Sequence, residues 1–281
     1  MLSLRALDAF DDFFNDLYSG CEAMGIPADT AISEGGAGQF EINLNHCDDA
    51  LRAADDSWFF KLLVKGLARK HGFAASFMAK PYPDHAGTGM HTHFSVLDDA
   101  GANIFDNGGP DGTDLMRSGI AGCLAAMPAS MLIFAPHANS FERFEEGSHA
   151  PTGIGWGYEN RTTAIRVPAG NHKARRIEHR VAGGDINPYL MLAAVLGAAL
   201  VGMEDGLTAP VATKGNAYDA GLTQLPVTWA DAINAFDGSE MMARILPPAL
   251  MDYFVMTKRQ ELKYVQAQSP SDRIALYLDT V

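Results

Sequence analysis

The sequence predicts an α+β fold in which a curved antiparallel sheet is flanked by helices. Strand-like and helix-like segments both occur, but without the regular strand–helix–strand rhythm of a parallel sheet. The strand candidates alternate polar and apolar residues, as expected for a sheet with one apolar and one polar face. Residues 208–281 read as a largely helical end of the same domain.

The first part of the chain predicts a helix, a strand and a second helix. Apolar residues recur at helical spacing over 4–24, and Gly25 is well placed to end that helix. Residues 39–45 alternate polar and apolar, which predicts a strand. A second helix is expected over 55–71, with basic residues in its last turn and Gly72 after it.

The middle of the chain predicts strands connected by long loops. Loops are expected over 98–112 and 138–157, and a helix of small residues over 113–127. Strands are expected over 73–80, 91–97, 162–167 and 175–181.

Capping residues mark the helices of the last third. Asn187 and Pro188 form an N-cap and first-turn pair that opens a buried helix, which Gly206 closes. Its apolar run is too short to span a bilayer. A linker-like stretch follows, and then Thr228 and Asp231 form a predicted capping box.

Composition narrows the class of protein. The 281 residues carry a formal net charge of −13, which disfavours nucleic acid and anionic membrane surfaces as partners. The chain has three cysteines without a CxxC pair, which suits a reducing, cytoplasmic location and provides neither a disulfide framework nor a zinc knuckle. The N-terminal residues carry acidic side chains and do not resemble a signal peptide.

Four strand candidates each place polar side chains on one face. Any one of them is best explained as a half-exposed strand. Together they form a set that needs counter-charges, water or a ligand, because a buried unpaired ion costs several kcal/mol. The polar faces carry Gln39, Glu41, Asn43 and Asn45; His91, His93 and Ser95; Thr162 and Arg166; and Arg176, Glu178 and Arg180.

These residue types suit phosphate chemistry. Carboxylates bind Mg²⁺ or Mn²⁺, and a histidine in the set tilts the preference slightly toward Mn²⁺. Arginine forks bind phosphate and carboxylate oxygens, and phosphoryl transfer depends mostly on positioning and charge neutralisation. Neither a Walker-type loop nor a GxGxxG loop is present in the sequence, so a nucleotide would be held by other means.

Six ordered segments resemble motifs of the glutamine synthetase family. Residues 34–41 are similar to its E…GQxE metal-site stretch, and 80–95 to its KP…GSGMHxHxS signature. The other four resemble its NSYKR flap, its NR…IR(I/V)P arginine strand, its KARRIExR segment and its ANPYL helix start, at residues 139–143, 157–168, 173–180 and 187–190.

The resemblance implies a fold and an activity. Residues 1–281 would form a catalytic domain of the glutamine synthetase and guanido kinase type, with 208–281 as its helical C-terminal part. The activity would be an ADP-producing ligase that joins glutamate to ammonia or an organic amine through γ-glutamyl phosphate. ATP and Mg²⁺ or Mn²⁺ would be the cofactors, and the full-length form would assemble as a ring-shaped homo-oligomer.

The resemblance also implies residue roles. Metal ligands would be Glu34, Glu41, His91 and Glu178. The nucleotide would be held by Lys173, Arg176, Arg166, His93 and Ser95, and glutamate by Gly87, Arg143 and Arg180. Catalysis would involve Arg161, which would contact the transferring phosphoryl group, together with Arg143 and His149.

The sequence departs from the family pattern in three ways. The N-terminal β-grasp domain and its Glu-x-Glu metal strand are absent, so each metal would lack a ligand and the chain alone is expected to be inactive until upstream sequence is restored. Ala86 replaces a family Asn, and His149 replaces the flap Glu of true glutamine synthetases. These replacements resemble the γ-glutamyl-amine branch, such as γ-glutamylputrescine synthetase-like enzymes.

Two other interpretations remain open at this point. The first is a catalytically inactive relative kept for assembly or nitrogen sensing, favoured by the missing domain but not by the retained carboxylates and arginines. The second is a cupin-like metalloprotein, which would explain only the pair His91 and His93.

Overall fold

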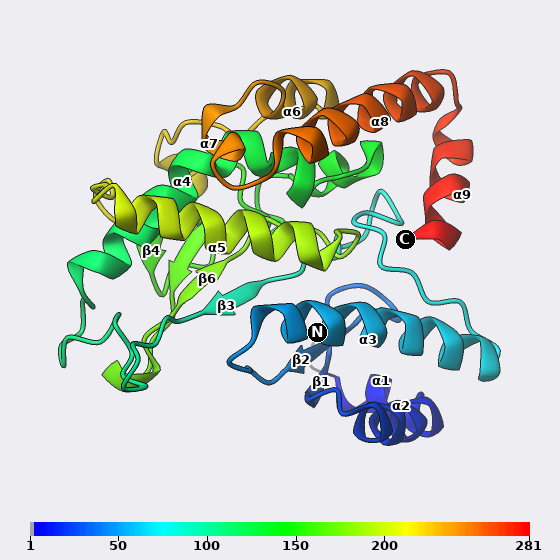
Figure 1. Ribbon diagram of the computed structural model, residues 1–281. Helices are drawn as coiled ribbons and strands as arrows, with labels where there is room; N and C mark the ends of the chain where they lie inside the picture. Colours follow the sequence, from blue (N-terminus) through cyan, green and yellow to red (C-terminus); the bar gives the residue numbers. More distant parts are fainter. Residues whose placement is uncertain (1–2) are drawn as a thin grey trace.

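The computed structural model describes residues 3–281 (Figure 1). A small N-terminal lobe has its own apolar core, in which Phe14, Leu17 and Cys21 are buried. A long helix, α3 (Ala50–Lys70), packs along α2 (Asp11–Met24) and along the main part of the molecule. The lobe consists of α1 (Leu4–Asp8), α2 (Asp11–Met24), the antiparallel pair β1 (Ala28–Ser33) and β2 (Phe40–Leu44), and α3 (Ala50–Lys70).

The main sheet has four strands in the order β3-β6-β5-β4. Its strands are β3 (Thr92–Phe94), β4 (Trp156–Tyr158), β5 (Ile165–Val167) and β6 (Ile177–His179). Strand β6 is antiparallel to both of its neighbours, whereas β4 and β5 are parallel. The α+β class is therefore confirmed, and the sheet departs from the expected antiparallel pairing only between β4 and β5.

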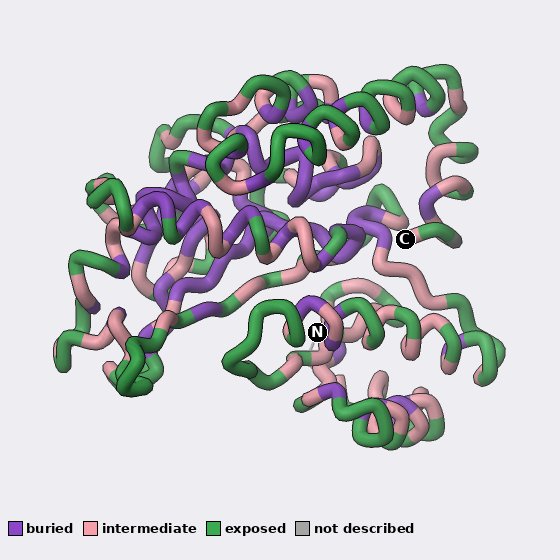
Figure 2. The backbone as a smooth tube through the Cα atoms, viewed as in Figure 1, coloured by how far each residue is buried: buried purple, intermediate pink, exposed green. Residues whose placement is uncertain are grey.

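Two long helices cover the sheet and form the core of the molecule, where burial is most continuous (Figure 2). Helices α4 (Asp114–Phe134) and α5 (Pro188–Glu204) pack backbone to backbone at Gly122 and Gly202. A Cβ atom on Gly122 would lie 2.1 Å from the carbonyl oxygen of Ala198, so this crossing requires glycine.

The C-terminal part is helical, as expected. Thr228 caps the first of its helices by accepting a hydrogen bond from the Asp231 amide at 3.1 Å, but the Asp231 carboxylate accepts from the Thr228 hydroxyl instead of completing the capping box. The helices are α6 (Trp229–Phe236), α7 (Glu240–Ala243), α8 (Pro248–Gln266) and α9 (Pro270–Thr280). Short 3-10 helices are η1 (Ala138–Arg143), η2 (His172–Ala174) and η3 (Ala217–Asp219).

Several predicted elements differ from the structure. The first helix is divided between α1 and α2, and α3 begins five residues earlier than the expected 55, at Ala50, with Asp49 as its N-cap. Residues 73–80 form no strand, because their backbone runs against the chain end, where Phe77 donates to Val281, instead of joining the sheet. Strands β1 and β4 were missed.

Helix α4 is the one described helix that is long and apolar enough to cross a membrane. It continues through Pro128 to Phe134, past the end that was predicted for it. Because 78% of its apolar window is buried inside the protein, the helix is explained as a core element. Helix α5, opened by Asn187 and Pro188 as predicted, is likewise a core helix.

Candidate active site

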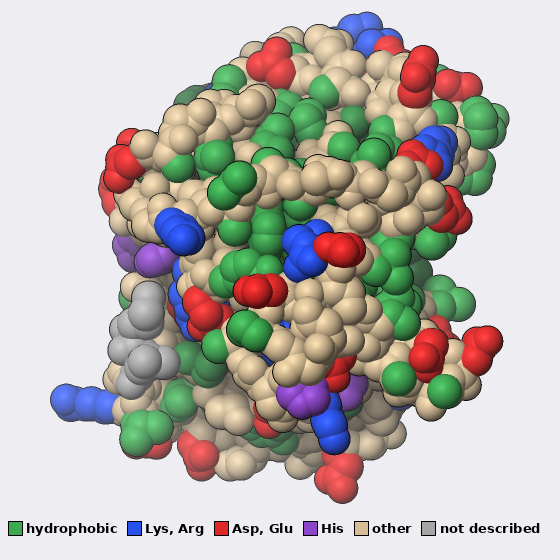
Figure 3. Space-filling view, turned by 90° about the vertical axis from the view of Figure 1, so that its left-hand side faces the viewer, with side chains coloured by type: hydrophobic (Ala, Val, Ile, Leu, Met, Phe, Trp, Pro, Cys, Tyr) green, Lys and Arg blue, Asp and Glu red, His purple; other side chains and the backbone are tan. Residues whose placement is uncertain are grey.

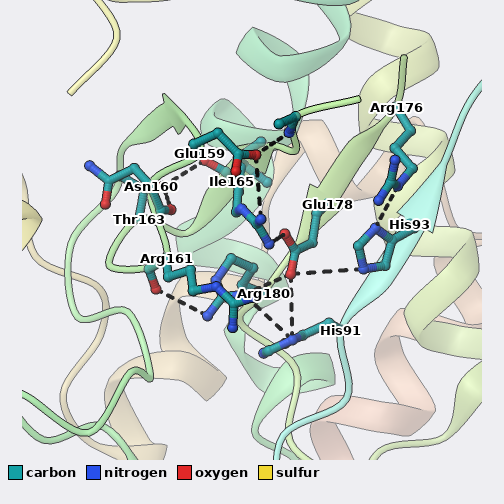
Figure 4. Close-up of polar contacts among 12 residues, drawn as sticks. His91, His93, Glu159, Asn160, Arg161, Thr163, Ile165, Arg176, Glu178 and Arg180 are labelled. Atoms are coloured by element: carbon teal, nitrogen blue, oxygen red, sulfur yellow. Dashed lines mark hydrogen bonds and ion pairs between the residues drawn. The ribbon is translucent and has the colours of Figure 1, made fainter. Parts of the chain in front are cut away.

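The Glu178 carboxylate lies at the centre of a charged cluster on β6 (Figure 4). Its side chain is 2% exposed. Arg180 Nη1 donates to Oε1 at 2.6 Å, and Arg166 Nη1 donates to Oε2 at 2.9 Å from the neighbouring strand β5. Two charge-assisted hydrogen bonds therefore compensate the buried carboxylate.

Two histidines from the next strand line the same cluster (Figure 4). His91 Nδ1 lies 3.5 Å from Glu178 Oε1, and His93 Nε2 lies 3.8 Å from the same oxygen. Arg176 Nε donates to His93 Nδ1 at 3.1 Å. Side chains on or next to β3, β5 and β6 thus lie around one carboxylate, and the polar faces predicted for these strands come together there.

The site favours neutral imidazoles. Burial, followed by the positive charges of Arg180 and Arg143, holds the pKa of His91 well below its usual value. Burial also lowers the pKa of His93, although the Glu178 carboxylate opposes that shift. Neutral imidazole is the form that can ligate a metal ion.

Arg143 is the last residue of η1, and its guanidinium lies next to the backbone of Arg180. Its guanidinium is buried and donates to the carbonyl oxygen of Val181 at 2.8 Å, and burial lowers its pKa to about 10. Gly87 and Gly89 pass directly over this side chain. A Cβ atom on Gly87 would lie 2.7 Å from Arg143 Cγ, and one on Gly89 would lie 2.8 Å from Nη2. The glycines therefore let the backbone approach the arginine closely.

Glu34 and Glu41 form an acidic pair on the β1–β2 hairpin. This hairpin is separate from the main sheet. Burial, and then the neighbouring Glu34 carboxylate, raises the pKa of Glu41. The charge of Arg161 acts in the opposite direction on the same carboxyl. Gln39 connects the hairpin to the main site by donating to the Gly87 carbonyl at 3.0 Å.

The predicted metal ligands therefore occur as two pairs. Within residues 3–281, no three His, Cys, Asp or Glu side chains gather closely enough to hold a metal ion. The chemistry of each pair fits a divalent cation, since Glu34 and Glu41 repel one another and His91 is held neutral. A divalent cation at either pair would need further oxygen or nitrogen ligands.

Four predicted residues are exposed and are not among the direct side-chain contacts of Glu178 in the described part of the chain. Arg161 is exposed, and its backbone carbonyl accepts from Arg180 Nη2 at 3.0 Å. Lys173 is exposed on η2, and Ser95 is exposed just after β3. His149 is exposed on the loop after Arg143, with a φ of 62° that is uncommon for residues other than glycine.

Sequence reasoning missed three groups that support the site. Asp185 is buried and its Oδ2 accepts from His137 at 3.0 Å and from Ser140, which fixes η1 beneath Arg143. Lys80 is buried beside the loop after Arg143, and Tyr218 contacts the same loop. Of these, only Lys80 gave a signal, as the first residue of the Lys-Pro motif.

Charged side chains of both signs lie on the surface of the molecule. On the face drawn in Figure 3, acidic and basic side chains are interspersed. In the site, by contrast, Arg166 and Arg180 gather around Glu178.

Comparisons with known proteins agree with this geometry. The family described as "Glutamine synthetase, catalytic domain" matches residues 1–277. Gamma-glutamylputrescine synthetase PuuA of Escherichia coli (strain K12) is 38% identical over 260 residues, covering 92% of this chain and 55% of that protein. A glutamate–isopropylamine ligase from a Pseudomonas species is 36% identical, covering 92% of this chain and 57% of that one.

A relative named as a glutamine synthetase is similar to nearly the same extent. Glutamine synthetase of Methanocaldococcus jannaschii is 33% identical, covering 92% of this chain and 59% of its own length. Among solved structures, the "GmaS/ADP complex" superposes with a TM-score of 0.87 at 30% identity, covering 99% of this chain and 66% of that one. The chain spans a little over half the length of the curated relatives it matches.

Proposed function

The chain belongs to the glutamine synthetase family, and we propose that it forms the catalytic part of an ATP-dependent ligase making γ-glutamyl amides. The reaction would join the side-chain carboxylate of glutamate to an amine through γ-glutamyl phosphate. The observation that carries the proposal is the convergence of Arg166, Arg180 and His91 on Glu178, because such a set can neutralise and orient phosphate and carboxylate oxygens.

Two cation positions follow from the paired ligands. Glu34 and Glu41 would hold one Mg²⁺ or Mn²⁺, and His91 and Glu178 the other. Bound cations would supply charge neutralisation for the triphosphate. Around them, the nucleotide would be contacted by Arg166, Arg176, His93, Ser95 and Lys173.

Glutamate would lie between the glycine loop and the arginines. Gly87, Arg143 and Arg180 would orient it. Its γ-carboxylate oxygen would attack the γ-phosphorus of ATP, breaking the bond to ADP, while Arg161 contacts the transferring phosphoryl group. The amine would then attack the γ-carbonyl carbon, lose a proton and expel phosphate. The arginines would balance the negative charge in both steps.

The acceptor is proposed to be an organic amine rather than ammonia. A flap carboxylate would attract ammonium, whereas His149 stands at that position and a neutral imidazole carries no negative charge. Relatives named for putrescine and isopropylamine support this choice, although glutamine synthetases are similar to nearly the same extent.

The test measures glutamate-dependent ADP release and γ-glutamyl amide formation with ammonia and with a panel of mono- and diamines. It compares this chain with a longer form that supplies the additional length found in the relatives, because the match covers 55% of one of them. We expect turnover in the longer form and preference for an amine. Turnover with ammonia and with no amine in the panel would contradict the acceptor assignment.

The second candidate is a catalytically inactive relative. Its support is the occurrence of metal ligands in pairs within residues 3–281. A longer form that binds ATP and glutamate, yet releases no ADP with any acceptor, would favour this candidate over the ligase.

A further inference from the structure

The loop that follows Arg143 is folded into one defined shape. Ser148 Oγ donates to the Glu145 carbonyl at 2.6 Å and lies 3.2 Å from the Arg143 carbonyl. Gly147 and His149 both have positive φ angles, of 79° and 62°. For His149 such a backbone is unfavourable by itself, so contacts with the rest of the protein must hold residues 144–150 in place.

One such contact comes from Tyr218 on η3. Its hydroxyl donates to the Ala150 carbonyl oxygen at 2.9 Å, although the two residues are 68 positions apart. Ala150 is 2% exposed, so this carbonyl would be left without a partner if the hydroxyl were removed. Burial raises the pKa of the Tyr218 phenol, and the hydroxyl therefore keeps its proton at neutral pH.

The segment that carries Tyr218 is itself tied to the turn that carries Arg161. Asn160 Nδ2 donates to the carbonyls of Thr213 at 3.2 Å and Gly215 at 2.8 Å. The Ala217 amide donates to Thr162 Oγ1 at 2.9 Å. Residues 213–218 therefore connect the Arg161 turn to the loop that bears His149.

The other end of the loop has an anchor of its own. Lys80 Nζ lies 3.1 Å from Glu145 Oε2, and the lysine side chain is 5% exposed. The Lys80 backbone is fixed in turn by Asn139 on η1, which accepts from its amide at 3.1 Å and donates to its carbonyl at 2.9 Å. The loop is thus held at Glu145 and again at Ala150.

We propose that Tyr218 is a positioning residue that, with Lys80 at the opposite end, holds residues 144–150 over the arginine cluster. The inference rests on the proposed ligase function for its chemical consequence. A loop held there excludes water from γ-glutamyl phosphate. If water reaches that intermediate, its oxygen attacks the γ-carbonyl carbon and phosphate leaves, so ATP is spent and glutamate is regenerated without an amide.

The first experiment measures backbone hydrogen exchange in this chain and needs no activity. Tyr218→Phe removes only the hydroxyl, and Tyr253→Phe on the exposed face of α8 is the matched control, since Tyr253 is 66% exposed. Losing one hydrogen bond should accelerate exchange at residues 145–150 by about five- to tenfold in Tyr218→Phe alone. Unchanged exchange there, or equal acceleration throughout α4, overturns the proposal.

The second experiment uses the longer form of the protein, which is expected to turn over ATP and is called the turnover-competent form. It measures the ratio of phosphate released to amide formed. Tyr218→Phe and Glu145→Gln should both raise this ratio above the wild-type value, whereas Tyr253→Phe should not. If Tyr218→Phe accelerates exchange in the loop but leaves the ratio of phosphate to amide unchanged, the loop does not shield γ-glutamyl phosphate from water. If wild type releases no ADP at all, the ligase function fails, and the exchange measurement still decides whether Tyr218 holds the loop.

Discussion

Arg180 Nη1 lies 2.6 Å from Glu178 Oε1, and the two side chains are only 4% and 2% exposed. With Arg166 on the other carboxylate oxygen, this contact leaves Glu178 charge-compensated before any ligand arrives. If the proposed cation is shared with His91, it would have to compete with Arg180 for the carboxylate. Cation binding and orientation of the arginines would then be coupled through one side chain.

The first prediction concerns this pair. Glu178→Gln should lower the free energy of unfolding by about 3 kcal/mol, because it leaves the buried Arg180 guanidinium without its counter-charge and leaves Arg166 with only Glu159. Urea unfolding followed by circular dichroism measures the change. Glu204→Gln is the control, since this carboxylate is 58% exposed and 3.9 Å from its arginine. Equal stability of the two variants would show that Glu178 is not buried against the arginines.

The second prediction concerns metal binding by the acidic pair. Saturating Mn²⁺ should stabilise the chain, by about 2.7 kcal/mol at a hundred times its dissociation constant, because it binds only the folded state. Glu41→Gln should reduce this stabilisation and, without metal, should raise the melting temperature by relieving repulsion with Glu34. Calorimetric melting with EDTA and with Mn²⁺ measures both effects. A variant that keeps the full Mn²⁺ response would remove Glu41 from the ligand set.

The third prediction concerns the pH dependence of stability. Lys61 Nζ donates to the carbonyls of Gly184 at 2.6 Å and Ile186 at 2.9 Å, and burial lowers its pKa from 10.5 to about 8 despite the nearby Asp185 carboxylate. A lowered lysine pKa means that the unfolded chain binds more protons between these two values. Stability conferred by this position should therefore rise as pH increases from about 8 toward 10.5.

Lys61→Met is the variant that isolates this effect. The difference in unfolding free energy between wild type and variant should shift in favour of wild type by about 3 kcal/mol from pH 7.5 to pH 10.5. Lys65, whose charge also acts on Lys61, is present in both proteins. A difference that stays constant over this range would mean that Lys61 keeps an ordinary pKa in the fold.

The sequence predicts elements well where their signals are local. Residues 39–45 alternate and form β2, and Asn187 caps α5 as its side chain and the following proline indicate. Residues 73–80 failed because strand formation needs a partner, and Phe77 instead pairs with the distant Val281. The motifs identified Glu178 as a site residue, but the contact of Tyr218 with Ala150 depends on two separate loops meeting and left no pattern.

The last prediction contrasts a glycine in crowded surroundings, Gly87, with one that has open space around it, Gly66. A Cβ atom on Gly87 would meet Arg143 Cγ at 2.7 Å and the Ala79 carbonyl oxygen at 2.9 Å, so backbone or arginine must move. Gly66, in the exposed interior of α3, has nothing within 4 Å of the added atom. Gly87→Ala should therefore destabilise by about 1–3 kcal/mol, whereas Gly66→Ala should stabilise by about 0.5–1 kcal/mol.

Glutamate binding separates the two variants further. Displacing Arg143 should weaken binding of glutamate in Gly87→Ala more than binding of ATP, and Gly66→Ala should leave both unchanged. Titration calorimetry on the turnover-competent form, with each ligand in turn, measures these affinities. Equal weakening of glutamate and ATP in Gly87→Ala would indicate general loss of folding. Unchanged glutamate affinity would remove the Gly87–Arg143 contact from the glutamate site, because that contact must open to admit the alanine side chain.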